Sequence, residues 1–267
     1  MQVVTKCITL QYMKLINKTI LITGGGAGIG LALTTVLAKQ NNNVIITGRS
    51  LDKLQEAKKL IPSIRIFQSD VADPASIDLL FEQLKQQGIV LDMLFNNAGV
   101  IEVWDIANQF LPTETIFNKL NTNLAGPISI TQHFIRQANR DKENYIVNIS
   151  SEGAIMPVPI LPLYSSSKAG LSAFTQALRM QLAKSKFKVI EIIPPAVETK
   201  MTTEDLNNTT KLVKPDHFAQ NVVKKIEAGK MEYAPSPNAT LLRLIRRFFP
   251  KSGLKLIDRE SRKQLLG

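Results

Sequence analysis

The stretch KTILITGGGAGIGLALTTVLA, residues 18–38, places an apolar run, a glycine-rich turn and a helical pattern in direct succession. The β-branched run predicts a buried strand over 18–22, and the apolar spacing from Leu31 onward predicts a helix. Glycines let the backbone turn tightly and approach a pyrophosphate closely. A helix N-terminus adds free N–H groups and a positive dipole for the same anion. The stretch therefore predicts a dinucleotide-binding turn.

The turn leaves two alternatives open. Gly24, Gly28 and Gly30 give the spacing Gly-x-x-x-Gly-x-Gly instead of the commoner Gly-x-Gly-x-x-Gly. A plain tight turn fits these glycines, and a Rossmann methyltransferase would share the strand and the turn. A phosphate-loop nucleotide triphosphatase is disfavoured, because no Lys-Ser/Thr pair follows the glycines.

Strand-like and helix-like segments alternate along the rest of the chain. Strands are expected at 18–22, 43–47, 64–69, 91–95, 145–150, 187–193 and 230–234. Such alternation predicts one α/β, doubly wound Rossmann-type domain with a seven-stranded parallel sheet and helices on both faces. We assign this domain to residues 13–234. Ligands bind at the carboxyl ends of such strands, which is where these residues fall: Gly24, Asp70, Asn97, Ser151 and Pro194.

A second motif carries proton chemistry. Tyr164 and Lys168 lie four residues apart in a helical pattern, so both side chains lie on one helix face. A nearby cation favours the phenolate, so Lys168 is expected to lower the pKa of Tyr164. Ser151 ends a buried strand and can bond the same substrate oxygen. Taken alone, the pair also fits a surface tyrosine and lysine on an amphipathic helix.

These motifs, in this order, resemble the short-chain dehydrogenase/reductase family over Met13 to Tyr233. The resemblance rests on the glycine turn, Asp70-Val71, Asn96-Asn97-Ala98-Gly99, Asn123, Ser151 and the Tyr164/Lys168 pair. It implies that Tyr164 is the general acid or base, that Lys168 lowers the tyrosine pKa and holds the nicotinamide ribose, that Ser151 polarises the carbonyl, and that Asn123 holds a water linked to Lys168. The implied cofactor contacts are Gly24, Gly26, Ala27, Gly28, Ile29, Gly30, Asp70, Val71, Asn97, Ala98, Gly99, Tyr164, Lys168, Val197 and Thr199.

One position departs from the family pattern. Pro195 stands where the family usually has glycine after the sixth strand. Proline fixes φ, so the loop geometry at this point is expected to differ while the chemistry is kept. The Pro194-Pro195 pair is similar to a bacterial subgroup related to the oxidoreductase of the D-alanyl teichoic acid cluster.

The end of the second strand indicates which cofactor binds. An NAD enzyme of this type usually has a carboxylate there for the adenosine ribose, but this chain has Gly48 followed by Arg49. A guanidinium suits a 2′-phosphate, so we expect NADP(H) in preference to NAD(H). Two observations weigh on the other side: Ala27 lacks the basic side chain of many NADP-dependent relatives, and Arg49 is also consistent with a solvated residue.

The C-terminal 33 residues, 235–267, carry eight Lys or Arg against two acidic residues, more than half of the net charge of +11. Residues 239–249 interleave apolar residues and arginines, which predicts a basic amphipathic helix. Such a helix can lie on an anionic membrane through residues 239–263, cover a substrate mouth, form a subunit contact or simply pack on the body. No nucleic-acid motif accompanies the charge, so nucleic acid is not an expected partner.

Composition sets the remaining expectations. Cys7 is the only cysteine, which excludes an intrachain disulfide and favours a reducing compartment. We therefore expect a cytoplasmic protein, with membrane association through the tail as the alternative. Residues 1–12 are read as an extension or an upstream start, since Met13 resembles the usual family start. The polar segment 199–214 fits either a substrate lid or a plain surface loop.

The leading functional hypothesis is an NADP(H)-dependent oxidoreductase that interconverts a carbonyl and an alcohol. The alternative is a nucleotide-binding sensor or membrane-surface scaffold with little turnover. No metal is expected. The substrate pocket is expected to draw on Glu102, Val103, Trp104, Glu152, Ile155, Pro157 and Ile160, which suggests a lipophilic small molecule. The resemblance also implies a homodimer or homotetramer.

Overall fold

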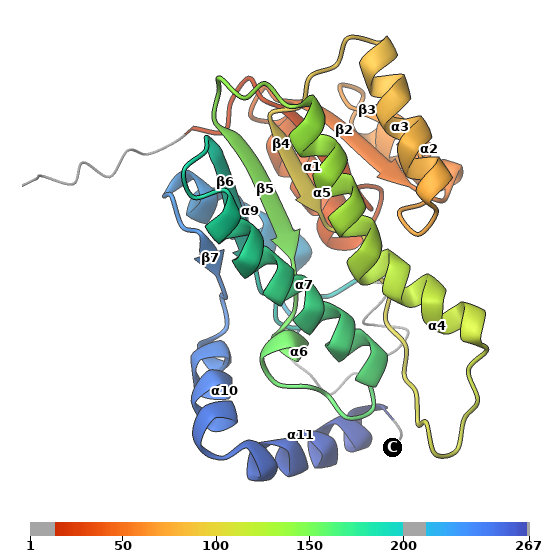
Figure 1. The fold of residues 1–267 in the computed structure, drawn as a ribbon, viewed down its shortest axis with the longest axis vertical. Helices are drawn as coiled ribbons and strands as arrows, with labels where there is room; N and C mark the ends of the chain where they lie inside the picture. Colours follow the sequence, from red (N-terminus) through yellow and green to blue (C-terminus); the bar gives the residue numbers. More distant parts are fainter. Residues whose placement is uncertain (1–13, 200–211, 266–267) are drawn as a thin grey trace, which may run out of the picture.

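A single sheet organises the chain in this computed structural model, which describes residues 14–199 and 212–265. Seven parallel strands lie in the order β3-β2-β1-β4-β5-β6-β7 (Figure 1). They are β1 (Thr19–Thr23), β2 (Asn43–Gly48), β3 (Arg65–Gln68), β4 (Met93–Asn96), β5 (Asn144–Ile149), β6 (Phe187–Ile192) and β7 (Glu232–Tyr233). The predicted doubly wound parallel sheet is confirmed. Because the strand order reverses between β1 and β4, the carboxyl ends of these two strands form the crevice in which such folds bind ligands.

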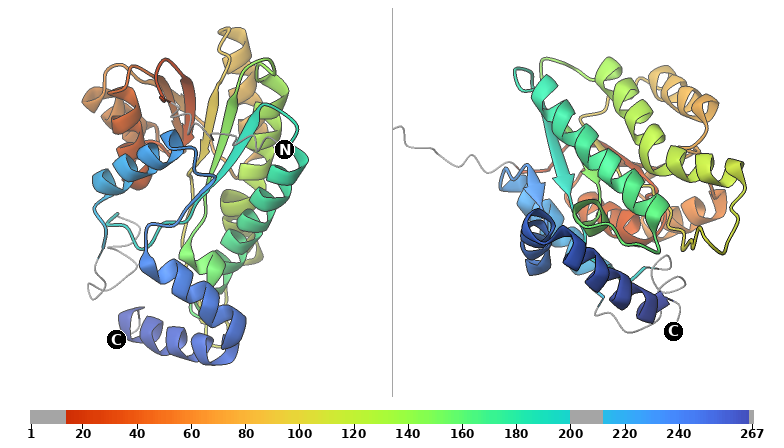
Figure 2. Two further views of the ribbon diagram at one scale, coloured as in Figure 1. Left: turned by 90° about the vertical axis from the view of Figure 1, so that its left-hand side faces the viewer. Right: turned by 60° about the horizontal axis from the view of Figure 1, so that its bottom comes forward.

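Helices cover both faces of the sheet (Figures 1 and 2). On one face lie α1 (Gly28–Ala38), α2 (Leu51–Leu60) and α9 (Pro215–Glu227), which pack through Leu33, Leu54 and Phe218. On the other face lie α3 (Pro74–Gln86), α5 (Gly126–Gln137) and α7 (Pro162–Gln181). Burial of apolar side chains on both faces explains why the strands read as continuous hydrophobic runs.

The helical segment predicted over 113–137 is interrupted at its centre. α4 (Thr113–Leu120) runs into a π-helical turn, η1 (Asn121–Ala125), before α5 begins at Gly126. Only glycine fits at 126, because an added Cβ would lie 2.0 Å from the carbonyl oxygen of Val71. Pro127 follows and has no N–H to donate to the ladder. The π-helical turn, a feature often found at functional sites, places Asn123 beside the crevice.

The basic tail forms two helices beyond the carboxyl ends of the strands, α10 (Pro237–Phe248) and α11 (Pro250–Leu265) (Figure 1). Arg246 of α10 donates to the carbonyl oxygens of Ala154 and Ile155, which belong to the short helix α6 (Glu152–Ile155). The tail is therefore bonded to the element that follows Ser151.

Two predictions concern residues that the structure does not describe. Residues 1–12 lie outside the described residues, and so do residues 200–211 of the segment interpreted as a lid. The two ends of that segment are described: Val197 forms a parallel bridge with Val213, and the amide of Glu198 donates to the carbonyl oxygen of Val213 at 2.9 Å. The chain after Pro195 is thereby fixed at the edge of the crevice.

Candidate active site

The glycine turn after β1 adopts a conformation that side chains would obstruct. Gly24 and Gly28 have φ angles of +66° and +52°, which L-residues with side chains rarely adopt. A Cβ on Gly30 would lie 2.2 Å from the carbonyl oxygen of Gly24. The first turn of α1 can therefore close onto the loop, and its N-terminus faces the crevice, as pyrophosphate binding requires.

A cavity of about 500 Å³ occupies this crevice. Most of the residues predicted to contact the cofactor line it: Gly24, Gly26, Ala27, Gly28, Ile29, Arg49, Asp70, Val71, Asn97, Ala98, Gly99, Tyr164, Lys168 and Thr199. Four predicted site residues are not among its lining: Gly30, Asn123, Ser151 and Val197. Gly30 lies under the turn, and Val197 is buried.

The structure adds lining residues that the sequence analysis missed. Lys53 lies in the first turn of α2 and shares the cavity wall with Arg49. Ser50 caps α2 by accepting a hydrogen bond from the amide of Lys53 at 3.3 Å. Among the described residues, neither Arg49 nor Lys53 has an acidic partner within ion-pair distance. The signal was available, because a helix that begins at the end of β2 must turn its first residues toward the crevice.

Tyr164 and Lys168 meet in the cavity as the spacing predicts. The Lys168 Nζ atom lies 5.9 Å from the centre of the Tyr164 ring, and both side chains project from the first half of α7. Lys168 is buried, and its Nζ donates to the carbonyl oxygen of Ile149 at 2.9 Å. The ammonium is thus held between the end of β5 and the phenol.

Ser151 has two roles in the structure. Its hydroxyl caps α6 by accepting from the amide of Gly153 at 3.1 Å. The same hydroxyl is hydrogen-bonded to the phenol of Tyr164 and favours the ionised tyrosine. The cap fixes the serine rotamer, so the hydroxyl stays beside the phenol.

The pKa of Tyr164 moves in the direction opposite to the sequence expectation. Burial raises this pKa, and the hydrogen bond from Ser151 offsets the increase only in part. Burial also lowers the pKa of Lys168 to about 8. A low-dielectric site disfavours both charged forms, and burial is the largest cause of both shifts. The expected lowering of the tyrosine pKa was therefore wrong for this structure, and the phenol keeps its proton at neutral pH.

Asn123 joins the π-helical turn to the strand that follows β4. Its side-chain carbonyl accepts from the amide of Val100 at 2.8 Å, and its amide donates to the Val100 carbonyl at 2.8 Å and to Ser167 Oγ at 3.1 Å. A Cβ on Gly99 would lie 3.4 Å from both Asn123 Oδ1 and Lys168 Nζ. Asn123 and Lys168 therefore flank the same glycine, at the back of the cavity.

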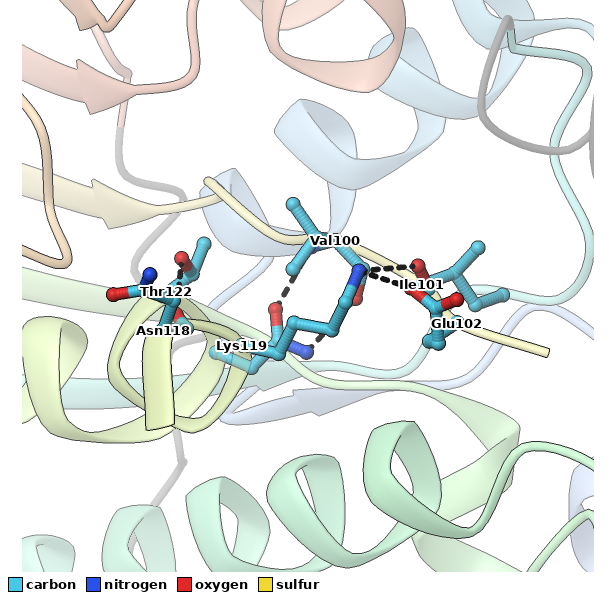
Figure 3. Close-up of polar contacts among 7 residues, drawn as sticks. Val100, Ile101, Glu102, Asn118, Lys119 and Thr122 are labelled. Carbon is cyan, nitrogen blue, oxygen red and sulfur yellow. Dashed lines mark hydrogen bonds and ion pairs between the residues drawn. The ribbon is translucent and has the colours of Figure 1, made fainter. Parts of the chain in front are cut away.

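The neighbouring loop is fastened by α4, as Figure 3 shows. Lys119 donates to the carbonyl oxygen of Ile101 at 3.4 Å and forms an ion pair with Glu102. Thr122 donates to the carbonyl oxygen of Asn118 at 2.8 Å, within the turn that carries Asn123. Glu102, expected to line the substrate pocket, is thus paired with a lysine and does not line the cavity in the crevice.

Glu152 is the other acidic residue expected at the substrate side. Burial raises its pKa, and a hydrogen bond with Ser236, which caps α10, acts in the opposite direction. Trp104 is bonded to the segment that precedes α7, because its amide donates to the carbonyl oxygen of Ile160 at 3.0 Å. None of the residues expected at the substrate side lines the cavity in the crevice, so a lipophilic ligand stays a prediction.

Sequence comparison places these features in a known context. A family model described as short chain dehydrogenase matches residues 18–210. The uncharacterized oxidoreductase DltE of Bacillus subtilis is 34% identical over 226 residues, covering 82% of this chain and 88% of that protein. The 17-beta-hydroxysteroid dehydrogenase type 3 of Homo sapiens is 28% identical over 240 residues, covering 84% of this chain and 76% of that protein. The resemblance to the subgroup of the teichoic acid cluster oxidoreductase is confirmed.

Among solved structures, a short chain dehydrogenase from Burkholderia cenocepacia, determined in complex with NADP, superposes with a TM-score of 0.78. It is 19% identical, and the match covers 92% of this chain and 99% of that one. The likeness supports the fold. No helix in the described part of the chain has the length and apolar character to cross a membrane.

Proposed function

The chain belongs to the short-chain dehydrogenase family, and on that premise we propose that it is an NADPH-dependent reductase that converts a lipophilic carbonyl compound to its alcohol. One observation carries the proposal. Tyr164 and Lys168 line the same cavity as a glycine turn free of side chains, and Ser151, just outside that lining, interacts with the Tyr164 phenol. A proton donor and an anion cradle in one cavity suit a reductase better than a binding protein.

The cavity fits a nicotinamide dinucleotide. The glycine turn and the N-terminus of α1 offer backbone N–H groups to a pyrophosphate, and no Cβ obstructs the approach at Gly24 or Gly28. The predicted residues Asp70 and Asn97 line the cavity between this turn and Tyr164. When bound, the nicotinamide supplies the hydride, and the residues of this chain supply position and the proton.

Two cations at the end of β2 support NADP(H) over NAD(H). Arg49 and Lys53 both line the cavity, and a 2′-phosphate is the charged group of the cofactor that suits such a pair. Lys53 supplies the second basic side chain that Ala27 does not. In addition, the described wall at this end has Gly48 where an NAD enzyme would place a carboxylate. The related Burkholderia protein was determined in complex with NADP.

The protonation states of Tyr164 and Lys168 support reduction as the direction of the reaction. A phenol whose pKa is raised by burial is protonated at neutral pH and is ready to donate to a developing alkoxide. Ser151 bonds the phenol and can donate to the same substrate oxygen. Lys168, with a pKa of about 8, can pass a proton toward the phenol after each turnover, and Asn123 lies beside Gly99 where such a path would begin.

A consumption assay tests the function. Purified protein is mixed with NADPH and a panel of aldehydes, ketones, 3-oxoacyl thioesters and oxidised sterols that carry a keto group, and absorbance of the reduced cofactor is followed. Substrate-dependent oxidation supports the proposal, and the preferred compound identifies the substrate class. Tight NADPH binding without oxidation by any compound would favour the alternative hypothesis of a nucleotide-binding sensor with little turnover. The expected homodimer or homotetramer is checked on the same sample by analytical ultracentrifugation.

A further inference from the structure

Helix α10 presents an apolar stripe to solvent. Leu241, Leu244 and Phe248 recur at spacings of three and four residues, so they lie on one face of the helix. They are 52%, 50% and 62% exposed, and Phe249, at the end of the helix, is 66% exposed. Packing on the body does not account for this stripe, because α10 already uses its opposite face, with Ala239 buried and Arg246 bonded to α6.

Helix α11 presents a row of cations. Lys251, Lys255 and Arg259 are spaced four residues apart and are exposed, whereas Gly253 and Ser261 on other sides of the helix are buried. Among the described residues, none of these three cations has an acidic partner within ion-pair distance. By contrast, Arg262 is paired with Asp258.

The loop beside the active-site mouth extends this surface. The loop between β4 and α4 carries Asp105 and reaches the end of the molecule where α11 lies (Figure 1). The same loop exposes Ile106 by 70% and Phe110 by 89%. Helices α10 and α11 lie together at one end of the molecule (Figure 2), and both α10 and this loop expose apolar side chains.

The apolar stripe on α10 and the cations on α11 together favour one kind of partner. A second copy would bring two strongly basic tails together, which electrostatic repulsion opposes. A nucleic acid would use the cations but has no use for an exposed leucine and phenylalanine stripe. An anionic bilayer uses both, because apolar side chains enter the region between headgroups and acyl chains while Lys and Arg bind the headgroups.

We propose that α10 and α11 form a docking surface for an anionic lipid membrane. Leu241, Leu244 and Phe248 insert into the interface, and Lys251, Lys255 and Arg259 bind anionic headgroups. The surface holds the protein peripherally, with the carboxyl ends of the strands toward the lipid. This binding needs neither substrate nor turnover, so it is tested independently of the proposed enzymatic activity.

Vesicle co-sedimentation of the full chain tests the charge part. The protein is expected to pellet with vesicles of phosphatidylcholine and phosphatidylglycerol at low salt, and to do so less at high salt, with little pelleting on phosphatidylcholine alone. The triple variant Lys251→Glu/Lys255→Glu/Arg259→Glu should partition at least about a hundredfold more weakly, since each basic residue contributes about a factor of five. The matched control Lys59→Glu/Lys85→Glu/Lys184→Glu changes the net charge equally and should bind as wild type. Equal loss in both triple variants would contradict a defined surface.

Tryptophan emission tests the apolar part. Trp104 is the only tryptophan of the chain, so Trp104→Phe/Phe248→Trp carries a single reporter in the stripe. Its emission should shift to shorter wavelength on phosphatidylglycerol vesicles, whereas Trp104→Phe/Leu60→Trp, with its reporter on an exposed site of α2, should not shift. An unshifted Phe248→Trp reporter would overturn the proposal. If the emission of this reporter shifted in buffer without vesicles, and did so more at higher protein concentration, the stripe would be a contact between two copies of this chain. That result would also overturn the proposal.

Discussion

The Nζ atom of Lys168 lies 5.9 Å from the centre of the Tyr164 ring, one helical turn further along α7. The two groups share one buried environment, which raises the pKa of the phenol and lowers that of the ammonium. Both pKa values therefore shift toward the neutral forms, but a pKa of about 8 leaves Lys168 mostly protonated at pH 7. The pair is consequently arranged for a phenol that gives up a proton and an ammonium that can supply the next one.

Lys168 should make the stability of the protein depend on pH. Its pKa is lowered from 10.5 to about 8, so the stability associated with the neutral amine is present above pH 10.5 and is lost as pH falls through 8. Between pH 7 and pH 10 the free energy of unfolding of wild type, without added cofactor, should rise by about 2 kcal/mol relative to Lys168→Met. Urea denaturation of both proteins at the two pH values measures the difference. A pH-independent difference would mean that the ammonium is well solvated.

Arg49 and Lys53 should determine the cofactor preference. Replacing either with alanine removes a charge-assisted hydrogen bond to a 2′-phosphate, so the KM for NADPH should rise about 10- to 100-fold. The KM for NADH should stay nearly constant, because NADH lacks that phosphate. Lys59→Ala, at an exposed position on α2, is the matched control. A wild-type KM that is lower for NADH than for NADPH would contradict the assignment.

Gly30 should tolerate no side chain. In Gly30→Ala the new Cβ would lie 2.2 Å from the carbonyl oxygen of Gly24, so the glycine turn must move. We expect a loss of about 1–3 kcal/mol of stability, together with weakened cofactor binding. Gly48→Ala is the control for stability, since its nearest contact would be an ordinary 3.6 Å. Thermal unfolding and NADPH fluorescence titration check the two effects.

Replacing Ser151 should distinguish its role as a helix cap from its role in catalysis. Ser151→Ala removes both the cap on α6 and the hydrogen bond to Tyr164, whereas Asp73→Ala removes a comparable cap on α3 from a residue that does not line the cavity. Both variants should lose about 1 kcal/mol of stability. Only Ser151→Ala should also lose activity, by about 10²-fold or more, if its hydroxyl polarises the substrate carbonyl. Parallel unfolding and steady-state assays distinguish the two roles, and equal activities would reduce Ser151 to a cap.

The sequence predicted the elements that depend on local pattern. Alternating apolar runs and helical periodicity gave the seven-stranded sheet, and the glycines located the turn. The sequence did not predict the π-helical turn at Asn121–Ala125, because it depends on how closely Gly126 must approach Val71, a contact 55 residues away in the chain. Lys53 could have been found from the sequence, because α2 follows β2 directly and its first turn lies beside the crevice; it was missed because only the end of β2 was considered.

The direction of the Tyr164 pKa shift could not be predicted from the sequence either. A four-residue spacing shows that an ammonium lies beside a phenol, and proximity alone predicts a lowered tyrosine pKa. The outcome depends on burial of both groups, which is set by the packing of α7 against β5 and by the carbonyl of Ile149 that engages the lysine. Such long-range effects on a local pair cannot be judged from residue spacing.

Stopped-flow oxidation of NADPH by Tyr164→Phe, with the best substrate of the panel, tests the central claim most directly. Loss of the phenolic hydroxyl should slow hydride transfer by about 10²–10⁴-fold, while the affinity for NADPH changes little. Tyr233→Phe, a half-buried tyrosine on β7, serves as the control and should react at the wild-type rate. A Tyr164→Phe protein that consumes NADPH as fast as wild type would show that another group delivers the proton.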